Sequence, residues 1–81
     1  MSNLEKYKQA FCNSFNVTED ELPGLKYQAV KLWDSVGHMN LVAELEDAFD
    51  IMMETDDIID LSSFEKGIDI LKEKYDVDFS E

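Results

Sequence analysis

The stretch Ser35–Phe49, with the sequence SVGHMNLVAELEDAF, decides the fold because its apolar residues recur with the period of an α-helix. At about 100° per residue, one face of this segment gathers side chains that a helix buries against a core. Asp34 and Ser35 at its start are residue types that favour the N-cap position. We therefore expect a helix over about 35–50. The predicted core face consists of His38, Leu41, Val42, Leu45, Ala48 and Phe49.

Two other segments, about 3–15 and 63–75, show the same helical period. The first follows the candidate N-caps Ser2 and Asn3. The second follows Ser62, which opens the pattern Ser-Ser-Phe-Glu that is typical of a capping box. Both segments therefore predict helices. Their apolar stripes are Leu4, Tyr7, Phe11 and Phe15 in the first, and Phe64, Ile68, Leu71 and Tyr75 in the second.

The connections between these helices differ in length. Residues 16–34 form a long loop, with one helical turn expected at 18–21, before Pro23-Gly24 interrupts it. Residues 51–60 contain Thr55-Asp56-Asp57, which caps a short helical turn. No alternating strand pattern occurs. The sequence therefore predicts an all-α fold, a small four-helix bundle with three main helices, a short third helix and a long loop between the first two.

The whole chain, residues 1–81, is expected to form a single domain. Its ordered core is predicted over about 3–75, because the segment from Asp76 onward has little periodicity and chain ends fray readily. A chain of this length can build one hydrophobic core. It is too short for a second domain that would enclose a deep catalytic cleft. No nucleophile–base arrangement is evident either. We therefore expect no enzymatic activity of its own.

Charge limits the partners of this chain. It holds 7 Lys, no Arg and 19 Asp and Glu, for a net charge of −12. Such a charge repels the phosphates of nucleic acids and anionic membrane surfaces, so neither is expected as a partner. With 44% hydrophobic residues, however, the chain is too apolar for a disordered acidic tail. The sequence predicts a folded protein with a strongly negative surface.

Cysteine usage and the absence of targeting patterns indicate the compartment. The lone Cys12 has no partner for an internal disulfide, which is typical of a reducing environment. The first residues lack the basic-then-apolar pattern of a signal peptide, and no apolar run reaches the roughly 18 residues of a membrane span. We therefore expect a soluble, cytoplasmic monomer.

The negative charge is concentrated in one part of the chain. Between Lys31 and Lys66 there are ten acidic residues and no Lys or Arg. Within this segment, the face of the predicted 35–50 helix opposite the core carries Val36, Met39 and Ala43 among acidic side chains. This pattern fits either a solvated, soluble face or a surface that steers basic partners toward the helix.

The run Trp33–Phe49 resembles the Asp-Ser-Leu attachment motif of acyl carrier proteins, with Val36 in place of the common Leu. The helical layout adds to this resemblance, which covers residues 3–75. The resemblance implies that Ser35 carries 4′-phosphopantetheine, attached from coenzyme A by a phosphopantetheinyl transferase. Acyl groups would be held as thioesters on the thiol of this arm. By position, Asp34 is the acidic residue that precedes the modified serine.

The resemblance implies that this chain is a carrier on which partner enzymes act. The partners it implies are enzymes with basic docking surfaces that load, transfer or condense acyl groups. The sequence Trp-Asp-Ser-x-Gly-His at 33–38 is similar to that of free-standing carriers outside housekeeping fatty acid biosynthesis, which serve specialised lipids, polyketides or cell-surface products. The residues expected to bind partners are Asp34, Val36, Met39, Glu46, Asp47 and Asp50.

Other interpretations remain open. The chain fits an acidic helical module that binds a basic protein without modification, with Ser35 serving only as a helix cap. One His and one Cys are too few for a transition-metal set, and the Asp clusters lack the spacing of a calcium loop, so no metal is expected. Met52, Met53 and Ile58-Ile59 fit either ordinary core packing or a loosely packed region that yields to a guest acyl chain.

Overall fold

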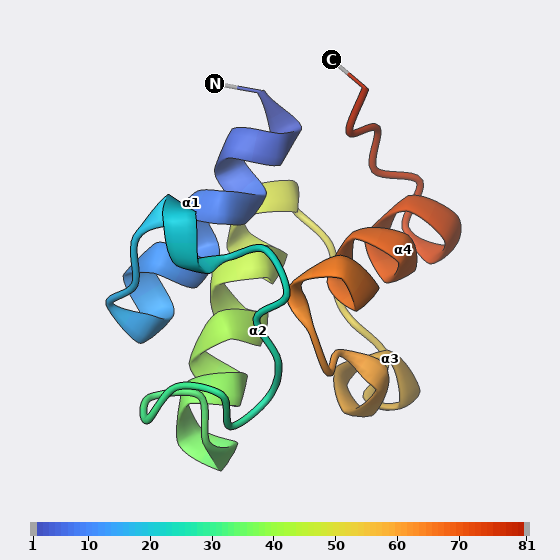
Figure 1. Ribbon diagram of the computed structural model, residues 1–81. Coiled ribbons are helices and arrows are strands. Elements are labelled where there is room, and N and C mark those ends of the chain that lie inside the picture. Colours follow the sequence, from blue (N-terminus) through green and yellow to red (C-terminus); the bar gives the residue numbers. More distant parts are fainter. Residues whose placement is uncertain (1, 81) are drawn as a thin grey trace.

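Four α-helices wrap around one core in the computed structural model, which describes residues 2–80 (Figure 1). No strand occurs within this range, where Lys26 and Ser63 form an isolated β-bridge. The predicted all-α class is confirmed, with three main helices, a short third helix and a long first loop. In chain order the elements are α1 (Asn3–Phe15), the 3-10 turn η1 (Glu19–Glu21), α2 (Ser35–Phe49), α3 (Thr55–Asp60) and α4 (Phe64–Lys74).

Side-chain caps define where α1, α2 and α4 begin. Ser2 Oγ accepts a hydrogen bond from the backbone N–H of Glu5 and caps α1, as predicted. The cap of α4 is Ser63, whose Oγ accepts from Lys66 N–H, so the prediction of Ser62 was wrong by one residue. The reason is tertiary: the carbonyl of Ser62 accepts from Tyr27 N–H of the long loop, which keeps this stretch extended for one residue more.

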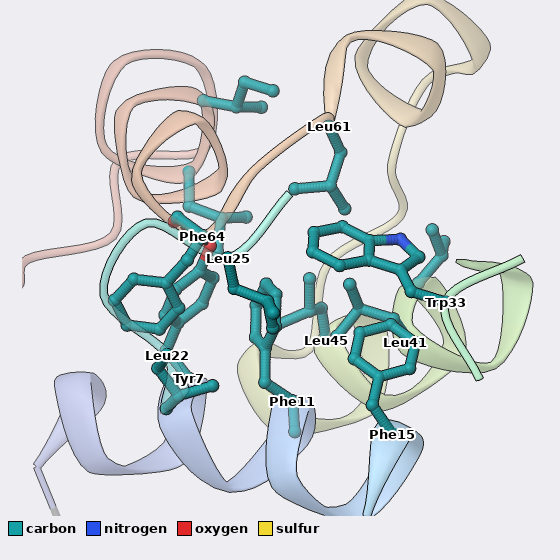
Figure 2. Packing of buried hydrophobic residues seen from close by; sticks show 14 of the residues in the cluster. Tyr7, Phe11, Phe15, Leu22, Leu25, Trp33, Leu41, Leu45, Leu61 and Phe64 are labelled. Carbon is teal, nitrogen blue, oxygen red and sulfur yellow. Dashed lines mark hydrogen bonds between the residues drawn. The ribbon is translucent and has the colours of Figure 1, made fainter. Parts of the chain in front are cut away.

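The core is built around aromatic side chains from α1 (Figure 2). Phe11 contacts Trp33 and Phe64 edge to face, with ring centroids 5.5 Å and 5.2 Å away. Phe15 stacks on Trp33 at 4.9 Å. The hydroxyl of Tyr7 donates a 2.6 Å hydrogen bond to the carbonyl of Phe64, so this polar group is satisfied inside the core. These contacts join α1 to the end of the long loop and to α4.

The core face of α2 is narrower than its periodicity predicts. Leu41, Val42 and Leu45 are buried, whereas the other members of the predicted face, His38, Ala48 and Phe49, are only half-buried. They lie toward the two ends of the helix. α1 packs chiefly against α2, and α3 and α4 lie on the other side of α2 in Figure 1.

The long loop is fixed by buried leucines and by pairing with the chain before α4. Leu22 and Leu25 are buried in the core. The carbonyl of Leu25 accepts from Phe64 N–H at 2.8 Å, on the same stretch where Tyr27 pairs with Ser62. A connection of this length needs such anchors to stay ordered. The loop therefore leads to the start of α2 along a defined path.

The packed chain continues past the end of α4. Val77 is buried, and the ring of Phe79 lies 5.6 Å from that of Tyr7. The side-chain amide of Asn3 donates to the carbonyl of Asp78 at 2.9 Å. The core therefore extends beyond the expected range of 3–75, because isolated apolar residues without helical period still fill the space between α1 and α4. Over residues 2–80, no helix has the length and apolar character needed to cross a membrane.

Candidate functional site

Ser35 is the first residue of α2, and its neighbour Asp34 does the capping. Asp34 Oδ1 accepts a 2.9 Å hydrogen bond from the backbone N–H of Gly37, which satisfies a donor that the helix itself leaves unpaired. The carbonyl of Asp34 also accepts from His38 N–H at 2.8 Å. Ser35 is exposed and is not the N-cap. Its hydroxyl is therefore free of the capping role that a serine at a helix start commonly has.

Gly37 brings the end of the long loop against the first turn of α2. A Cβ added at this position would collide with the carbonyl oxygen of Leu32, which is backbone and has little room to give. Gly is a poor helix former, with a penalty of about 1 kcal/mol relative to Ala. The close approach of the two backbones explains why Gly stands in this turn. It also fixes where Trp33 enters the core, directly before the capping residue Asp34.

His38 joins the loop, α2 and α3 through both of its ring nitrogens. The indole Nε1–H of Trp33 donates to His38 Nδ1 at 2.9 Å. His38 Nε2 lies 2.7 Å from the carbonyl oxygen of Ile58 in α3. Since an indole nitrogen only donates, Nδ1 accepts, and the proton of the neutral imidazole is on Nε2, where it is donated to Ile58. This chain of two hydrogen bonds is called the Trp33–His38–Ile58 relay below.

An apolar cleft of about 360 Å³ opens beside Ser35. It lies between the start of α2, α3, the connection from α3 to α4 and Tyr27 of the long loop. The side chains of α3 that face it are Ile58 and Ile59, and α2 contributes His38 and Met39. Ser35 is thus at the rim of a cleft with apolar walls. Such a cleft with a few polar groups at its edge is the usual form of a binding site for an organic ligand.

Exposed apolar side chains lie at this cleft and beside Ser35: Met39 and Ile59 line the cleft, and Val36 is the next residue after Ser35. Val36 is 71% exposed, Met39 53% and Ile59 71%. Large apolar side chains this exposed, grouped around one site and bordered by acids, are typical of docking surfaces. The structure therefore brings together Ser35, Asp34, Val36 and Met39, four of the residues predicted for the site, and adds Ile59 of α3. We call Val36, Met39 and Ile59 the apolar rim.

The predicted acidic residues of α2 lie farther away, and they are not equivalent. Asp47 is exposed, but twelve residues separate it from Ser35, about 18 Å along a helix. Asp50 ends the helix in a left-handed conformation, with φ of 53°. Glu46 is half-buried, and its carboxylate accepts a 2.9 Å hydrogen bond from Met53 N–H. Glu46 therefore has a structural role in the connection from α2 to α3.

Asp57 of α3 is a buried carboxylate that the sequence does not reveal. It is 2% exposed and accepts hydrogen bonds of 2.6 Å each from Lys74 Nζ and from the hydroxyl of Tyr75. The Tyr75 oxygen in turn accepts from Glu54 N–H at 2.8 Å. These bonds tie α3 to the end of α4. The sequence gives no signal for them, because Asp56, Asp57 and Asp60 look alike in an acidic segment.

The charges in this network perturb one another. The hydrogen bonds from Lys74 and, second, from Tyr75 hold the pKa of Asp57 below its ordinary value, against the opposing effect of burial. The bond to Asp57 raises the pKa of Lys74. Burial, and then the bond to Asp57, raise the pKa of Tyr75. The network is therefore most stable with an ionised carboxylate and a protonated amine.

The remaining candidates for chemistry are metal-ligating side chains and the thiol of Cys12. No group of three or more His, Cys, Asp or Glu in the described part of the chain is placed to hold a metal ion. Cys12 is half-buried, and burial, with Glu19 and Glu21 nearby, raises the pKa of its thiol. A thiol with a raised pKa is a poor nucleophile near neutral pH. Comparisons of the chain with protein-family models, with curated proteins and with solved structures each return no match.

Proposed function

We propose that this chain is a carrier of the acyl carrier protein type, in which Ser35 holds 4′-phosphopantetheine. The observation that carries the proposal is that Asp34 and Ser35 have separate roles at the start of α2. Asp34 caps the helix, and the adjacent Ser35 hydroxyl stays exposed at the rim of an apolar cleft. Because Asp34 makes the capping bond, a role as helix cap does not account for Ser35. The resemblance of residues 33–49 to the carrier attachment motif supports the same role.

The surroundings of Ser35 suit the group that the proposal requires. The N–H groups of Ser35 and Val36 in the first turn have no acceptor within the helix, and the N-terminal end of a helix favours an anion such as a phosphodiester. The cleft beside the hydroxyl offers apolar walls to whatever the arm carries. In the loading reaction the Ser35 oxygen would bond to the phosphate that carries pantetheine, and the bond between this phosphate and the other diphosphate phosphorus of coenzyme A would break. Adenosine 3′,5′-bisphosphate would leave, and the hydroxyl proton would pass to a base of the transferase.

The apolar rim supplies a surface for the partner enzymes that a carrier needs. Met39 and Ile59 line the cleft, Val36 follows Ser35 in the first turn of α2, and all three are exposed. Exposed acids lie on either side of them, Asp34 before the helix and Asp56 and Asp60 on α3. An apolar centre with a negative border fits basic enzymes, since charge around a docking surface speeds encounter more than it raises affinity. Asp47 and Asp50 extend the negative field along α2.

Mass spectrometry after modification tests this function. The protein is incubated with coenzyme A, Mg²⁺ and a phosphopantetheinyl transferase of broad specificity, and the intact mass is measured. The wild type is expected to gain one phosphopantetheinyl group and Ser35→Ala none. Ser62→Ala is the matched control, because Ser62 is also exposed and lines the same cleft. A wild type that gains no mass would instead favour an acidic helical module that binds a basic protein without modification.

A further inference from the structure

We propose that His38 limits the cargo that this protein shelters to short apolar acyl groups. The inference rests on the carrier function proposed above and deepens it, because it concerns the substrate class held beside Ser35. It comes from the position of the Trp33–His38–Ile58 relay. His38 and Ile58 both line the cleft, and the hydrogen bond between them links its α2 wall to its α3 wall. The bond therefore spans the gap between α2 and α3 at the cleft, where an acyl chain would pass between these two helices to reach the core.

The imidazole of His38 is held in place by contacts with three other residues. Its two nitrogens are engaged with Trp33 and with Ile58, at 2.9 Å and 2.7 Å. The ring lies nearly parallel to the indole of Trp33, with an interplanar angle of 12°, and the ring of Tyr27 meets it edge to face at 5.5 Å. A side chain held by two hydrogen bonds and two ring contacts does not move aside at low cost. His38 therefore acts as a closed partition between the cleft and the core.

The core behind this partition is filled. Trp33 is 0% exposed, and Leu41 and Leu61 beside it are buried as well. In Figure 2 the indole of Trp33 lies between Leu61 and Phe15, on which it stacks. Protein cores at this density have no free space for an added chain unless side chains move apart. A long acyl group could enter only by displacing the indole as well as the imidazole.

The free-energy cost of breaking the Trp33–His38–Ile58 relay applies to long acyl groups and not to short ones. A short acyl group fits against Met39, Ile58 and Ile59 in the cleft without disturbing the relay. A long acyl group would have to break the bond between His38 and Ile58 and leave the buried indole N–H of Trp33 without an acceptor. A buried donor without a partner is strongly unfavourable. Long chains are therefore expected to remain outside, over the apolar rim.

Carriers loaded with butanoyl, octanoyl and dodecanoyl groups test this inference. A chain sheltered by the folded state raises the midpoint of thermal unfolding, because it binds the folded protein and not the unfolded one. The wild type is expected to gain stability on butanoylation and no more with the longer groups. The indole N–H resonance of Trp33, the one tryptophan of the chain, should stay at the same position in all three. A midpoint that climbs with chain length, together with a shift of the indole signal, would overturn the proposal.

His38→Ala removes both bonds of the relay and should open the partition. In this variant the unfolding midpoint is expected to rise with chain length, and dodecanoyl loading should shift the indole signal. The fraction of molecules with the long chain inside should increase about tenfold to a hundredfold, the size of two net hydrogen bonds. Ser62→Ala is the matched control, because Ser62 is exposed, lines the same cleft and takes no part in the hydrogen bonds or ring contacts of His38. It should keep the wild-type dependence on chain length.

A second series separates failure of this inference from failure of the carrier function. In a Cys12→Ala background, Ser35→Cys is coupled through disulfides to butyl, octyl and dodecyl chains, so that no transferase is required. If Ser35 accepts no phosphopantetheine but the octyl and dodecyl chains stay outside, the carrier function fails and the partition at His38 stands. If the wild type is modified but the long chains enter the core without any change at His38, the carrier function stands and the partition is refuted.

Discussion

Asp34 Oδ1 accepts the backbone N–H of Gly37 at 2.9 Å, so that the aspartate caps α2 and the serine between them does not. Both residues at this helix start are good N-caps, and only one of them is used. The unused hydroxyl belongs to Ser35, the residue proposed to be modified. The structural role and the chemical role are therefore carried by adjacent side chains.

Replacing Asp34 by Ala should lower the free energy of unfolding by about 1 kcal/mol, because the N–H of Gly37 loses its acceptor. Asp34→Asn should retain most of that stability, since the amide oxygen accepts the same bond. Urea unfolding followed by circular dichroism measures both. Equal stability of the Ala variant and the wild type would show that the cap does not hold the start of α2.

Replacing Gly37 by Ala should destabilise the fold by about 1–3 kcal/mol, although Ala is the better helix former. The added methyl group meets the carbonyl of Leu32, and the loop end has to move away from α2. The matched control is Asn40→Ala, an exposed position of the same helix, which should gain a few tenths of a kcal/mol. Should Gly37→Ala also gain stability, the close approach of loop and helix would be refuted.

Asp57 makes the free energy of unfolding depend on pH in the acid range. Its folded pKa lies below the unfolded value, so its contribution is complete above the ordinary carboxylate range. This contribution is lost as the pH falls from about 5 through the lowered folded pKa. At neutral pH, Asp57→Asn should cost about 1–3 kcal/mol, because the bonds from Lys74 and Tyr75 weaken.

The pH profile separates Asp57 from general acid effects. The difference in unfolding free energy between wild type and Asp57→Asn should shrink as the pH falls below about 4, because the carboxylate is then protonated in the unfolded chain first and, at still lower pH, in the folded protein. Asp56→Asn, at the exposed neighbour, should follow the wild-type profile. A difference between wild type and Asp57→Asn that stays constant from neutral to acid pH would be inconsistent with an ionised Asp57 in the folded state.

The acids of α2 are expected to separate into structural and docking residues. Asp47→Lys should leave stability unchanged, slow acyl transfer by basic partner enzymes, and weaken the dependence of the rate on salt. Glu46→Ala should lower the free energy of unfolding by about 1 kcal/mol, because Met53 N–H loses its acceptor. Stopped-flow transfer assays over a range of ionic strength measure the first effect. Unchanged transfer by several partners would remove Asp47 from the docking surface.

The helices could be predicted from the sequence because their apolar residues recur with the helical period, as Tyr7, Phe11 and Phe15 do in α1. The sequence does not predict which of two adjacent cap-forming residues caps a helix. Asp34 and Ser35 are both cap formers, and the cap of α4 moved from Ser62 to Ser63 through pairing with a distant loop. Local pattern carries no information about such contacts.

Parts of the site depend on contacts between residues far apart in sequence. The bond from His38 to Ile58 spans twenty residues, and that from Lys74 to Asp57 spans seventeen. A lone histidine on a helix edge predicts only a packed, hydrogen-bonded side chain. Its partners, and the cleft that they enclose beside Ser35, follow from the placement of α3. The half-buried position of Glu46 follows from the turn after α2 in the same way.

Peptide mapping of the protein after incubation with coenzyme A, Mg²⁺ and a phosphopantetheinyl transferase tests the carrier function most directly. The proposed function predicts one phosphopantetheinyl group, on the peptide that contains Ser35. Asp34→Asn and Ser62→Ala should be modified in the same place, and Ser35→Ala should not be modified. An unmodified wild type, or a Ser35→Ala variant that gains the group as readily as the wild type, would contradict it.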